Sequence, residues 1–250
     1  MKPCLLIPIY EHKDEICGVV SALEPLGLPC LVIDDGSGAE TRRVLQTLAR
    51  THPWLSVQTR ERNGGRGAAL KTGYRLAAQR GFSHAIQLDA DGQHDASDVP
   101  RFLEEVARDP TALVLGAPLF DATAPRSRLY GRQLSRAMVW LATLSFDIVD
   151  PLCGFRAIPL APTVTLLDEV RTGDHMEFDP ELLIHLHRRG VPVRTLSTRV
   201  VYNPGGLSHF DTWRDNVRLS RVYARSLFST PGILTAARRG RSGRSAEEAR

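Results

Sequence analysis

The chain has 250 residues, which is long enough for one large α/β domain with a full core. Apolar residues make up 42% of it and charged residues 24%, an ordinary globular composition. The net charge of +4 is mildly basic and no DNA- or RNA-reading motif accompanies it. Nucleic acid is therefore not expected as a partner, whereas anionic ligands or a membrane surface are.

Four cysteines have apolar neighbours and show no C-x-x-C spacing: Cys4, Cys17, Cys30 and Cys153. This pattern predicts buried, reduced thiols and a cytoplasmic location. The longest apolar run, residues 139–149, is interrupted by Asp147 and is too short to span a bilayer. Contact with a membrane is therefore expected to be peripheral, at the inner face of the cell membrane.

Strand-like and helix-like segments alternate along the chain. Strands are expected at 4–9, 30–34, 54–59, 84–89 and 112–118, with helices between them at 13–24, 39–50, 65–80 and 96–108. After residue 120 the pattern loosens into a helix near 126–146, a strand near 153–158, a helix near 177–189, a strand near 192–202 and a helix over 210–228. Continuous apolar strands separated by helices predict a parallel sheet that is covered on both faces.

The chain is expected to form a single domain over residues 1–230, followed by a basic tail, 231–250. From residue 238 onward the tail has too few apolar residues to pack, so the sequence predicts that it is disordered.

Polar clusters follow three of the predicted strands: 8–12 (PIYEH), 34–38 (DDGSG) and 89–95 (DADGQHD). Ligands of an open parallel sheet bind beyond the carboxyl ends of its strands, so the three loops are expected to share a crevice. The alternative for 34–38 is a plain turn that N-caps the next helix.

The acidic residues at 89–95 repel one another, and a nearby like charge disfavours ionisation. A divalent cation is the natural compensating group, because hard cations take oxygen ligands. The alternative is a solvated acidic turn. A calcium-binding loop is excluded, because Gln93 and His94 stand where its Asp or Asn and its Gly belong.

The glycine-rich stretch 63–73 opens a predicted helix but lacks both the G-K-[ST] ending and the G-x-G-x-x-G fingerprint. Its backbone N–H groups could still face a phosphate. The alternative is that Gly65 and Gly67 only permit close packing of the helix on the sheet.

Six motifs occur in the order seen in family 2 glycosyltransferases: IPIYEH, VIDDGSG, GGRGAALKTG, LDADGQHD, LCGFRA and MEFDPELL. Over residues 1–210 the chain resembles the dolichyl (polyprenyl) phosphate mannosyltransferase-like branch of that family. The resemblance implies the GT-A fold, a nucleotide-binding α/β fold with a mostly parallel central sheet flanked by helices. It also implies metal-dependent transfer, with inversion, from a nucleotide-diphosphate sugar to a lipid-linked or hydroxyl acceptor.

The resemblance assigns Asp89 and Asp91 to the family's Asp-x-Asp motif, where they would hold Mg²⁺ or Mn²⁺ against the diphosphate of the donor. Gln93 stands where this branch can offer a further ligand. Pro8, Tyr10 and Asp35 match positions that contact the base and ribose. Gly65, Lys71, Arg128 and Arg132 complete the nucleotide-sugar-binding set that the resemblance implies. The family usually has Tyr-Asn-Glu where this chain has Tyr-Glu-His, at residues 10–12.

Arginines lie on the helix predicted near 126–146: Arg126, Arg128, Arg132 and Arg136. Steps of four put the last three on one face. In the related branch, basic residues here grip the diphosphate or the acceptor phosphate, and the arginine fork suits phosphate. A solvated basic face is the alternative. Arg156 is assigned equally to core support and to ligand contact.

Asp179 or Glu177 could take a proton from an acceptor hydroxyl as general base, and Asp179 is the preferred candidate. A phosphate acceptor needs no base, and the two carboxylates would then orient groups or cap the helix that follows. Asp179-Pro180 is a favourable helix start. Ser208 and His209 could touch phosphate or belong to a plain loop.

Four arginines recur at helical spacing near the end of the chain: Arg214, Arg218, Arg221 and Arg225. A basic amphipathic helix predicts contact with anionic lipid, whereas packing on the domain with solvated arginines is the alternative.

Two other functions remain open, a haloacid-dehalogenase-like phosphatase and a non-catalytic nucleotide-sugar-binding protein. The phosphatase would place its Asp-x-Asp motif at the first strand, whereas this chain has it after the fourth.

Overall fold

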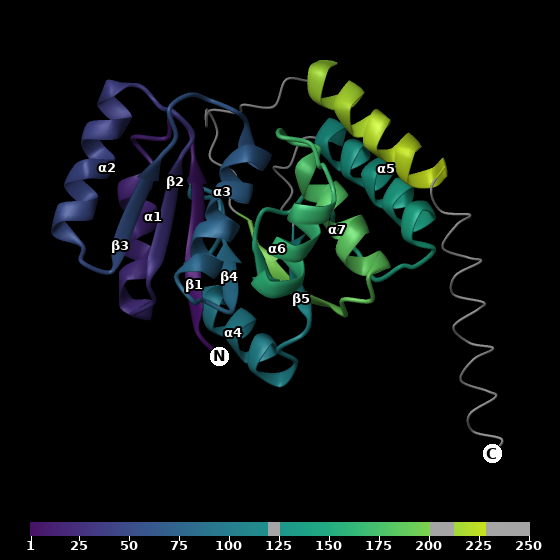
Figure 1. Ribbon diagram of the computed structural model, residues 1–250, viewed down its shortest axis with the longest axis horizontal. Helices are drawn as coiled ribbons and strands as arrows, with labels where there is room; N and C mark the ends of the chain where they lie inside the picture. Colours follow the sequence, from purple (N-terminus) through teal and green to yellow (C-terminus); the bar gives the residue numbers. More distant parts are fainter. Residues whose placement is uncertain (120–125, 201–212, 229–250) are drawn as a thin grey trace.

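A computed structural model describes residues 1–119, 126–200 and 213–228 of the chain, with the backbone alone for 126–129. The predicted tail, 231–250, lies outside the described residues. Figure 1 shows the sheet and helices of residues 1–108 beside a second group of helices formed by the later residues.

Seven strands of the described residues form one sheet in the order β3-β2-β1-β4-β6-β5-β7. They are β1 (Pro3–Ile9), β2 (Cys30–Asp34), β3 (Leu55–Thr59), β4 (His84–Gln87), β5 (Leu113–Leu119), β6 (Arg156–Pro159) and β7 (Val193–Arg199). Strand β6 runs antiparallel to both β4 and β5, and the other pairs are parallel. The mostly parallel sheet is thus confirmed, with one reversed strand that the alternation did not predict.

The helices are α1 (Ile16–Leu23), α2 (Ala39–Thr51), α3 (Arg66–Gln79), α4 (Val99–Arg108), α5 (Arg126–Thr143), α6 (Leu160–Glu169), α7 (Phe178–Arg188) and a further helix at 213–228. Short 3₁₀ turns at Glu24–Leu26 and Ala96–Asp98 adjoin α1 and α4. The sequence predicted all of these helices except α6.

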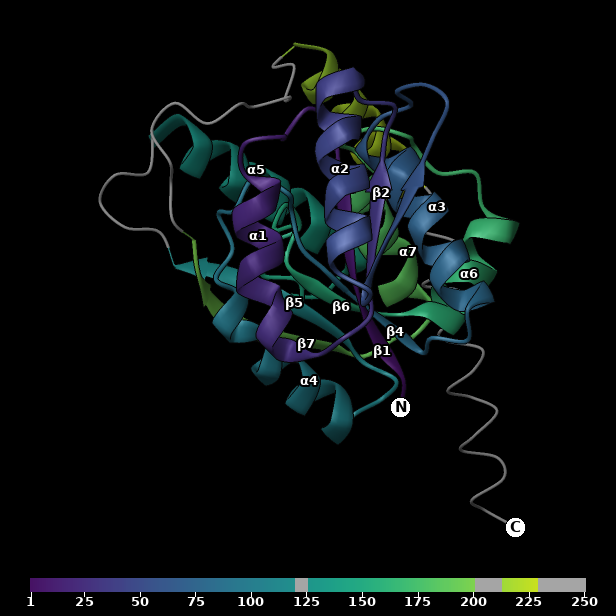
Figure 2. The ribbon, with the colours of Figure 1, turned by 90° about the vertical axis from the view of Figure 1, so that its left-hand side faces the viewer.

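The core lies on both faces of the sheet, because successive strand residues point to opposite sides. In β1, Leu5 and Ile7 pack with α1, α2 and α4, whereas Cys4 and Leu6 pack with α3, α6 and α7. Figure 2 shows α1 and α2 on one side of the sheet and α3 and α6 on the other. This double covering explains why the central strands are apolar along their whole length.

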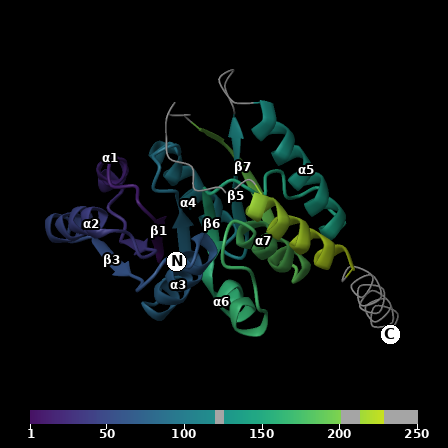
Figure 3. The same cartoon turned by 90° about the horizontal axis from the view of Figure 1, so that it is seen from above.

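Helices α5 and 213–228 lie side by side outside α7 (Figures 1 and 3). The Arg188 guanidinium of α7 joins them, because Nη2 donates to the Ala142 carbonyl (2.7 Å) and to the Ser226 carbonyl (2.6 Å). Both carbonyls are in the last turn of their helix, so the two helices run in the same direction. A cation at both C-termini complements the two helix dipoles.

Candidate active site

The loops after β1 and β2 are joined by Glu11. Its backbone N–H donates to Ser37 Oγ (3.1 Å), and its carboxylate accepts from the Gly38 N–H (2.5 Å) and the Thr41 hydroxyl (2.8 Å). The carboxylate thereby lies at the N-terminus of α2, where the helix dipole favours a negative charge. The predicted meeting of these two loops is confirmed, and Glu11 has a structural role in it.

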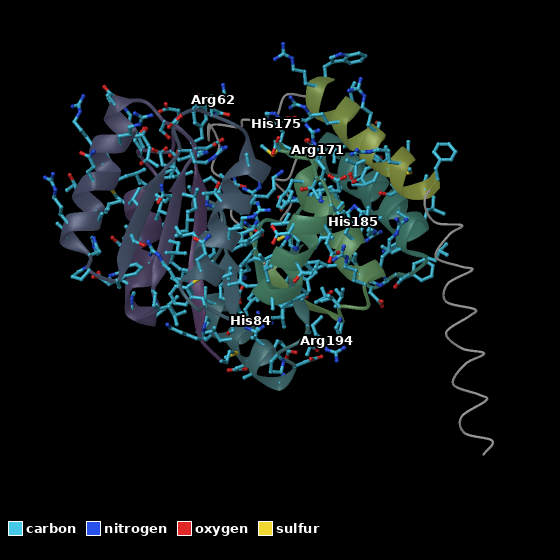
Figure 4. All side chains as sticks on the ribbon, in the orientation of Figure 1. Arg62, His84, Arg171, His175, His185 and Arg194 are labelled. Carbon is cyan, nitrogen blue, oxygen red and sulfur yellow. The ribbon has the colours of Figure 1, made fainter. Side chains whose placement is uncertain are left out.

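The loop after β4 reaches the same edge, since a Cβ atom on Gly92 would lie 3.7 Å from Val19 Cγ2, in the helix that follows the loop after β1. Figure 4 shows Arg62 and His175 at this edge, and His84, at the start of β4, at the opposite edge. The three polar strand ends therefore meet at the carboxyl edge of the sheet, as an open α/β site requires.

The two aspartates after β2 have different partners. Asp34 Oδ1 accepts from the Ser37 N–H (2.9 Å), which forms the predicted turn. Asp35 points instead to the loop before α3 and accepts from the backbone N–H groups of Gly65 (2.7 Å) and Gly64 (3.1 Å), and from the Arg60 guanidinium. A carboxylate with three donors fixes the glycine-rich loop at the edge of the site.

Arg66, the first residue of α3, lies between two carboxylates. Its Nη2 is 2.6 Å from Asp89 Oδ1, and its Nε donates to Asp179 Oδ2 (2.8 Å). Arg156 is fully buried and donates from Nη1 to Asp179 Oδ1 (2.7 Å). Its remaining N–H groups donate to backbone carbonyls of residues 151 and 153. Two arginines and two aspartates from distant parts of the chain thus form one charge network.

The network shifts the ionisation of the acidic motif in opposite directions. Burial alone raises the pKa of Asp89, but Arg66 and His94 beside it bring that pKa well below its usual range. The pKa of Asp91 is raised, by burial and then by the charge of Asp89. Burial opposes the charge of Arg66, yet Asp89 and Asp179 together raise the pKa of its guanidinium, which stays protonated.

The residues at 89–91 fit a divalent cation. Asp89 Oδ1 is buried and accepts no hydrogen bond of good geometry, although Arg66 is close. Among the described residues, the one hydrogen bond to Asp91 Oδ1 comes from the Gln93 N–H (3.0 Å). No three or more His, Cys, Asp or Glu side chains are grouped as a metal site within 1–119, 126–200 and 213–228. Two carboxylates suffice for Mg²⁺ if water and phosphate complete its coordination.

Lys71 of α3 does not join Asp89. Its ammonium group is 2.6 Å from Asp174 Oδ1 and donates to the backbone carbonyls of Thr172 (3.2 Å) and Gly173 (2.9 Å). It therefore ties α3 to the segment before α7, outside the charge network of Arg66.

The arginines predicted on α5 also have protein partners. Arg132 is paired with Asp150, and Arg136 lies over the Trp140 ring, 4.8 Å from its centroid. The side chains of Arg126 and Arg128 lie outside the described residues, as do Ser208 and His209. Arg132 and Arg136 share one side of α5, as the spacing predicted.

Pro8 and Tyr10 lie at the end of β1. Pro8 is buried within the strand, and Tyr10 follows it as a half-buried residue at the edge of the site.

Helix α7 begins at Phe178, two residues before the start predicted at Pro180. Its N-cap is Glu177, and Pro180 stands in the first turn. Asp179 lies inside the helix with both carboxylate oxygens bound by guanidinium groups. Glu177 is buried, and its Oε2 atom has no partner. The predicted helix cap at Asp179-Pro180 was therefore wrong, because the Asp179 carboxylate accepts hydrogen bonds from Arg66 and Arg156 instead.

The predicted arginine row on helix 213–228 is partly paired. Arg218 donates to Asp215 (2.9 Å), and Arg225 donates to Glu181 (3.1 Å). A groove of about 820 Å³ lies along this helix, lined by Glu177, Arg218, Arg221, Val222, Ala224, Arg225 and Phe228. The groove combines cationic and apolar groups, next to the N-terminus of α7.

Sequence reasoning missed the central residue of the network, Arg66. It stands inside the glycine-rich motif, but nothing local indicates that residues 89 and 179 meet there. The signal available was indirect: crowded carboxylates need a cation, and Arg66 opens the helix of that motif.

Comparison with known proteins gives concordant results. The sequence profile described as Glycosyl transferase family 2 matches residues 4–157. An undecaprenyl-phosphate mannosyltransferase of Micrococcus luteus is 31% identical over 167 residues, which cover 63% of this chain and 66% of that protein.

Two solved structures share the fold. Glucosyl-3-phosphoglycerate synthase of Mycobacterium tuberculosis, in complex with Mn²⁺ and UDP-glucose, is 19% identical with a TM-score of 0.66, covering 93% of this chain and 79% of that one. A mannosyltransferase of Pyrobaculum calidifontis, in complex with GDP-mannose and Mn²⁺, is 17% identical with a TM-score of 0.58, covering 94% and 74%.

Proposed function

The chain belongs to family 2 of the glycosyltransferases and acts on nucleotide sugars, and we propose that it passes the sugar to a lipid-linked acceptor with the help of Mg²⁺ or Mn²⁺. The observation that carries this proposal is the acidic pair Asp89 and Asp91 beside the Arg66 guanidinium, at the carboxyl edge of the sheet. Membership of this family excludes the alternative of a haloacid-dehalogenase-like phosphatase.

The donor is proposed to bind across the ends of β1 and β2. Asp35, with Pro8 and Tyr10, is placed at the base and ribose, because a carboxylate accepts hydrogen bonds from base N–H groups. In the structure the same carboxylate binds the Gly64 and Gly65 N–H groups, so it also supports the loop that faces the diphosphate.

Asp89 and Asp91 are proposed to hold the metal ion, with Gln93 beside them. When bound, the metal would offset the negative charge that develops on the leaving diphosphate. Arg66 is proposed to donate to the same diphosphate, because it is a protonated fork held at the N-terminus of α3, where the helix dipole also favours an anion. Asp89 keeps its charge at neutral pH, because Arg66 and His94 lower its pKa.

The acceptor is proposed to enter by the groove along helix 213–228. Its arginines suit a phosphate head group, and Val222, Ala224 and Phe228 suit an apolar chain. A phosphate oxygen attacks without a general base, since it is already anionic near neutral pH. Attack from the face opposite the leaving diphosphate inverts the anomeric centre.

The placement of Asp179 favours positioning over proton transfer. Both of its oxygens accept from guanidinium groups, which hold the carboxylate in a fixed orientation between Arg66 and Arg156. We assign it the role of orienting Arg66. A hydroxyl acceptor remains the second candidate, because Glu177 has an unpartnered oxygen near the groove.

Calorimetry with UDP and GDP, in the presence of Mn²⁺ or of a chelator, tests the donor site. We expect affinity only with metal, and its loss in Asp91→Asn. Asp95→Asn is the matched control, because Asp95 carries the same charge nearby but only caps the turn at residues 96–98. Equal affinity with chelator contradicts the metal-dependent proposal.

Transfer from UDP- and GDP-sugars to polyprenyl phosphate, followed by extraction of the lipid product, tests the acceptor. Donor binding without transfer to phosphate or hydroxyl lipids would favour the non-catalytic alternative.

A further inference from the structure

The two outermost helices, and the turn that follows α5, expose large apolar side chains. Seven of them are between 56% and 86% exposed: Tyr130, Leu134, Leu141, Leu144, Phe146, Trp213 and Phe228. We call these seven the outer apolar face. Elsewhere in the described residues, only Met1 and Leu119 among the large apolar side chains are comparably exposed. Such a concentration marks an interaction surface, because scattered single residues are the normal pattern.

The exposed residues of α5 follow one line along the helix. Tyr130, Leu134 and Leu141 are separated by four and seven residues, which places them on one side. The opposite side of α5 is packed, since Val139 and Ala142 belong to the same core as Leu219 and Tyr223 of helix 213–228. Helix α5 thus has two apolar sides, and only one of them has a partner in the described part of the chain.

The second helix has a similar outward side. Trp213 and Phe228, at its two ends, lie within about 60° of each other around the helix axis at 100° per residue. Figures 1 and 3 show this helix and α5 side by side, and Arg188 holds their last turns together. The two helices form one outer layer that presents aromatic and aliphatic groups.

The charge of this layer identifies the partner. Helix α5 carries four arginines and no acidic residue, and helix 213–228 carries four arginines and one aspartate. Arg132 and Arg225 also pair with acidic residues outside these helices, and the layer remains cationic. A symmetric contact with a second copy would bring these like charges together. An anionic bilayer instead accepts them, while aromatic and leucine side chains enter the boundary between head groups and acyl chains.

We propose that the outer apolar face inserts into the surface of an anionic bilayer, which the positive charge of the same two helices favours. No helix within 1–119, 126–200 and 213–228 is long and apolar enough to cross a membrane. The proposed attachment is by shallow insertion of two surface helices. Insertion of apolar side chains differs from attachment by the arginine row alone, because a large part of the membrane binding should persist at high salt.

The test uses the full chain and vesicles of phosphatidylcholine with phosphatidylglycerol, without donor or acceptor, so its outcome is independent of catalysis. We expect co-sedimentation that persists in part at about 1 M salt, where the Debye length is about 3 Å. Leu134→Ser/Leu141→Ser should bind at least about tenfold more weakly, since two apolar side chains are lost from the bilayer. Gln133→Ser, also exposed on α5, controls for the lower helix propensity of serine.

Depth is measured separately by fluorescence. In a Trp54→Phe/Trp140→Phe background, brominated lipid chains should quench Trp213, whereas a chain retaining only Trp54 should not be quenched.

Two results overturn the proposal. One is binding that disappears at high salt and is unchanged in the leucine variant, which indicates electrostatic attachment alone. The other is a wild-type chain that does not bind vesicles at all. If that chain forms a dimer and the leucine substitutions dissociate it, the outer apolar face is a contact between two copies of the chain.

Discussion

Arg66 is the residue on which the candidate site depends most. Its guanidinium contacts Asp89 and Asp179, which are both partly or fully shielded from water. An acidic pair at this position would be poorly ionised without a cation, and Arg66 supplies one from within the fold.

We predict that Arg66→Ala weakens nucleoside diphosphate binding and lowers the free energy of unfolding, each by about 1–3 kcal/mol, the range for hydrogen bonds to charged groups. Arg66→Lys should restore the charge but not both contacts, because an ammonium group lacks the planar fork. Calorimetry and urea unfolding check both quantities. Wild-type binding by Arg66→Ala would exclude a role for Arg66 in holding the donor.

Asp35 has two proposed roles, in the loop and at the base. We expect Asp35→Asn to weaken nucleotide binding by about 1–3 kcal/mol, since an amide places a donor where the base and the Gly65 N–H both need an acceptor. Arg60→Ala removes only the loop contact. If the two variants lose the same nucleotide affinity, Asp35 acts through the loop and not directly.

Single residues were predictable where a motif fixes them and not where tertiary contacts do. The acidic motif, the turn at Asp34 and the strand-end position of Asp35 followed from local pattern. The engagement of Lys71 with the segment before α7, and of both oxygens of Asp179 with arginines, depends on segments that only the fold brings together.

At the scale of elements, the sequence predicted the apolar strands and the long helices, but not helix α6 or the reversed direction of strand β6. Helix α6 carries proline and β-branched residues in its sequence, LAPTVTLLDE, which favour other structures locally. Packing of Leu166 and Leu167 in the core overrides that preference. The reversal of β6 depends on how its connections run, which periodicity does not report.

The contact between α3 and α7 is unusually close. A Cβ atom on Gly67 would lie 2.4 Å from Phe178 Cβ, so the predicted role of this glycine in close packing holds, but toward α7 and not toward the sheet. We expect Gly67→Ala to destabilise the fold by about 1–3 kcal/mol through overpacking. Gly18→Ala in α1 meets nothing within 4 Å and should be neutral or stabilising, by up to about 1 kcal/mol. Thermal unfolding of both variants compares them, and equal melting temperatures contradict the close contact.

Helix α7 also gives a pH dependence. Burial, and then Arg188, Arg189 and Arg225, lower the pKa of His185. The folded state then binds fewer protons than the unfolded state below about pH 6.5, so stability falls as the pH drops from there toward the lowered pKa. His185→Gln should flatten this loss in urea unfolding across the acid range.

For the whole molecule, one continuous sheet joins both groups of helices. We therefore expect a single unfolding transition, and a nucleoside diphosphate with Mn²⁺ at about 100 times its Kd should stabilise all of it by about 2.7 kcal/mol. Scanning calorimetry with and without ligand measures this. Two separate transitions, of which the ligand moves only one, would show that the halves unfold independently.

The reversed strand has a consequence for synthesis. Strand β4 pairs with β1 on one edge, but its other edge is closed only by β6, which leaves the ribosome much later. At about 5–20 residues per second, Arg156 follows Gln87 by roughly 3–14 s. During that interval the nascent chain presents an unpaired, apolar strand edge beside its future acidic motif. A chaperone that recognises extended apolar segments would meet this protein at β4, before the second half of the sheet exists.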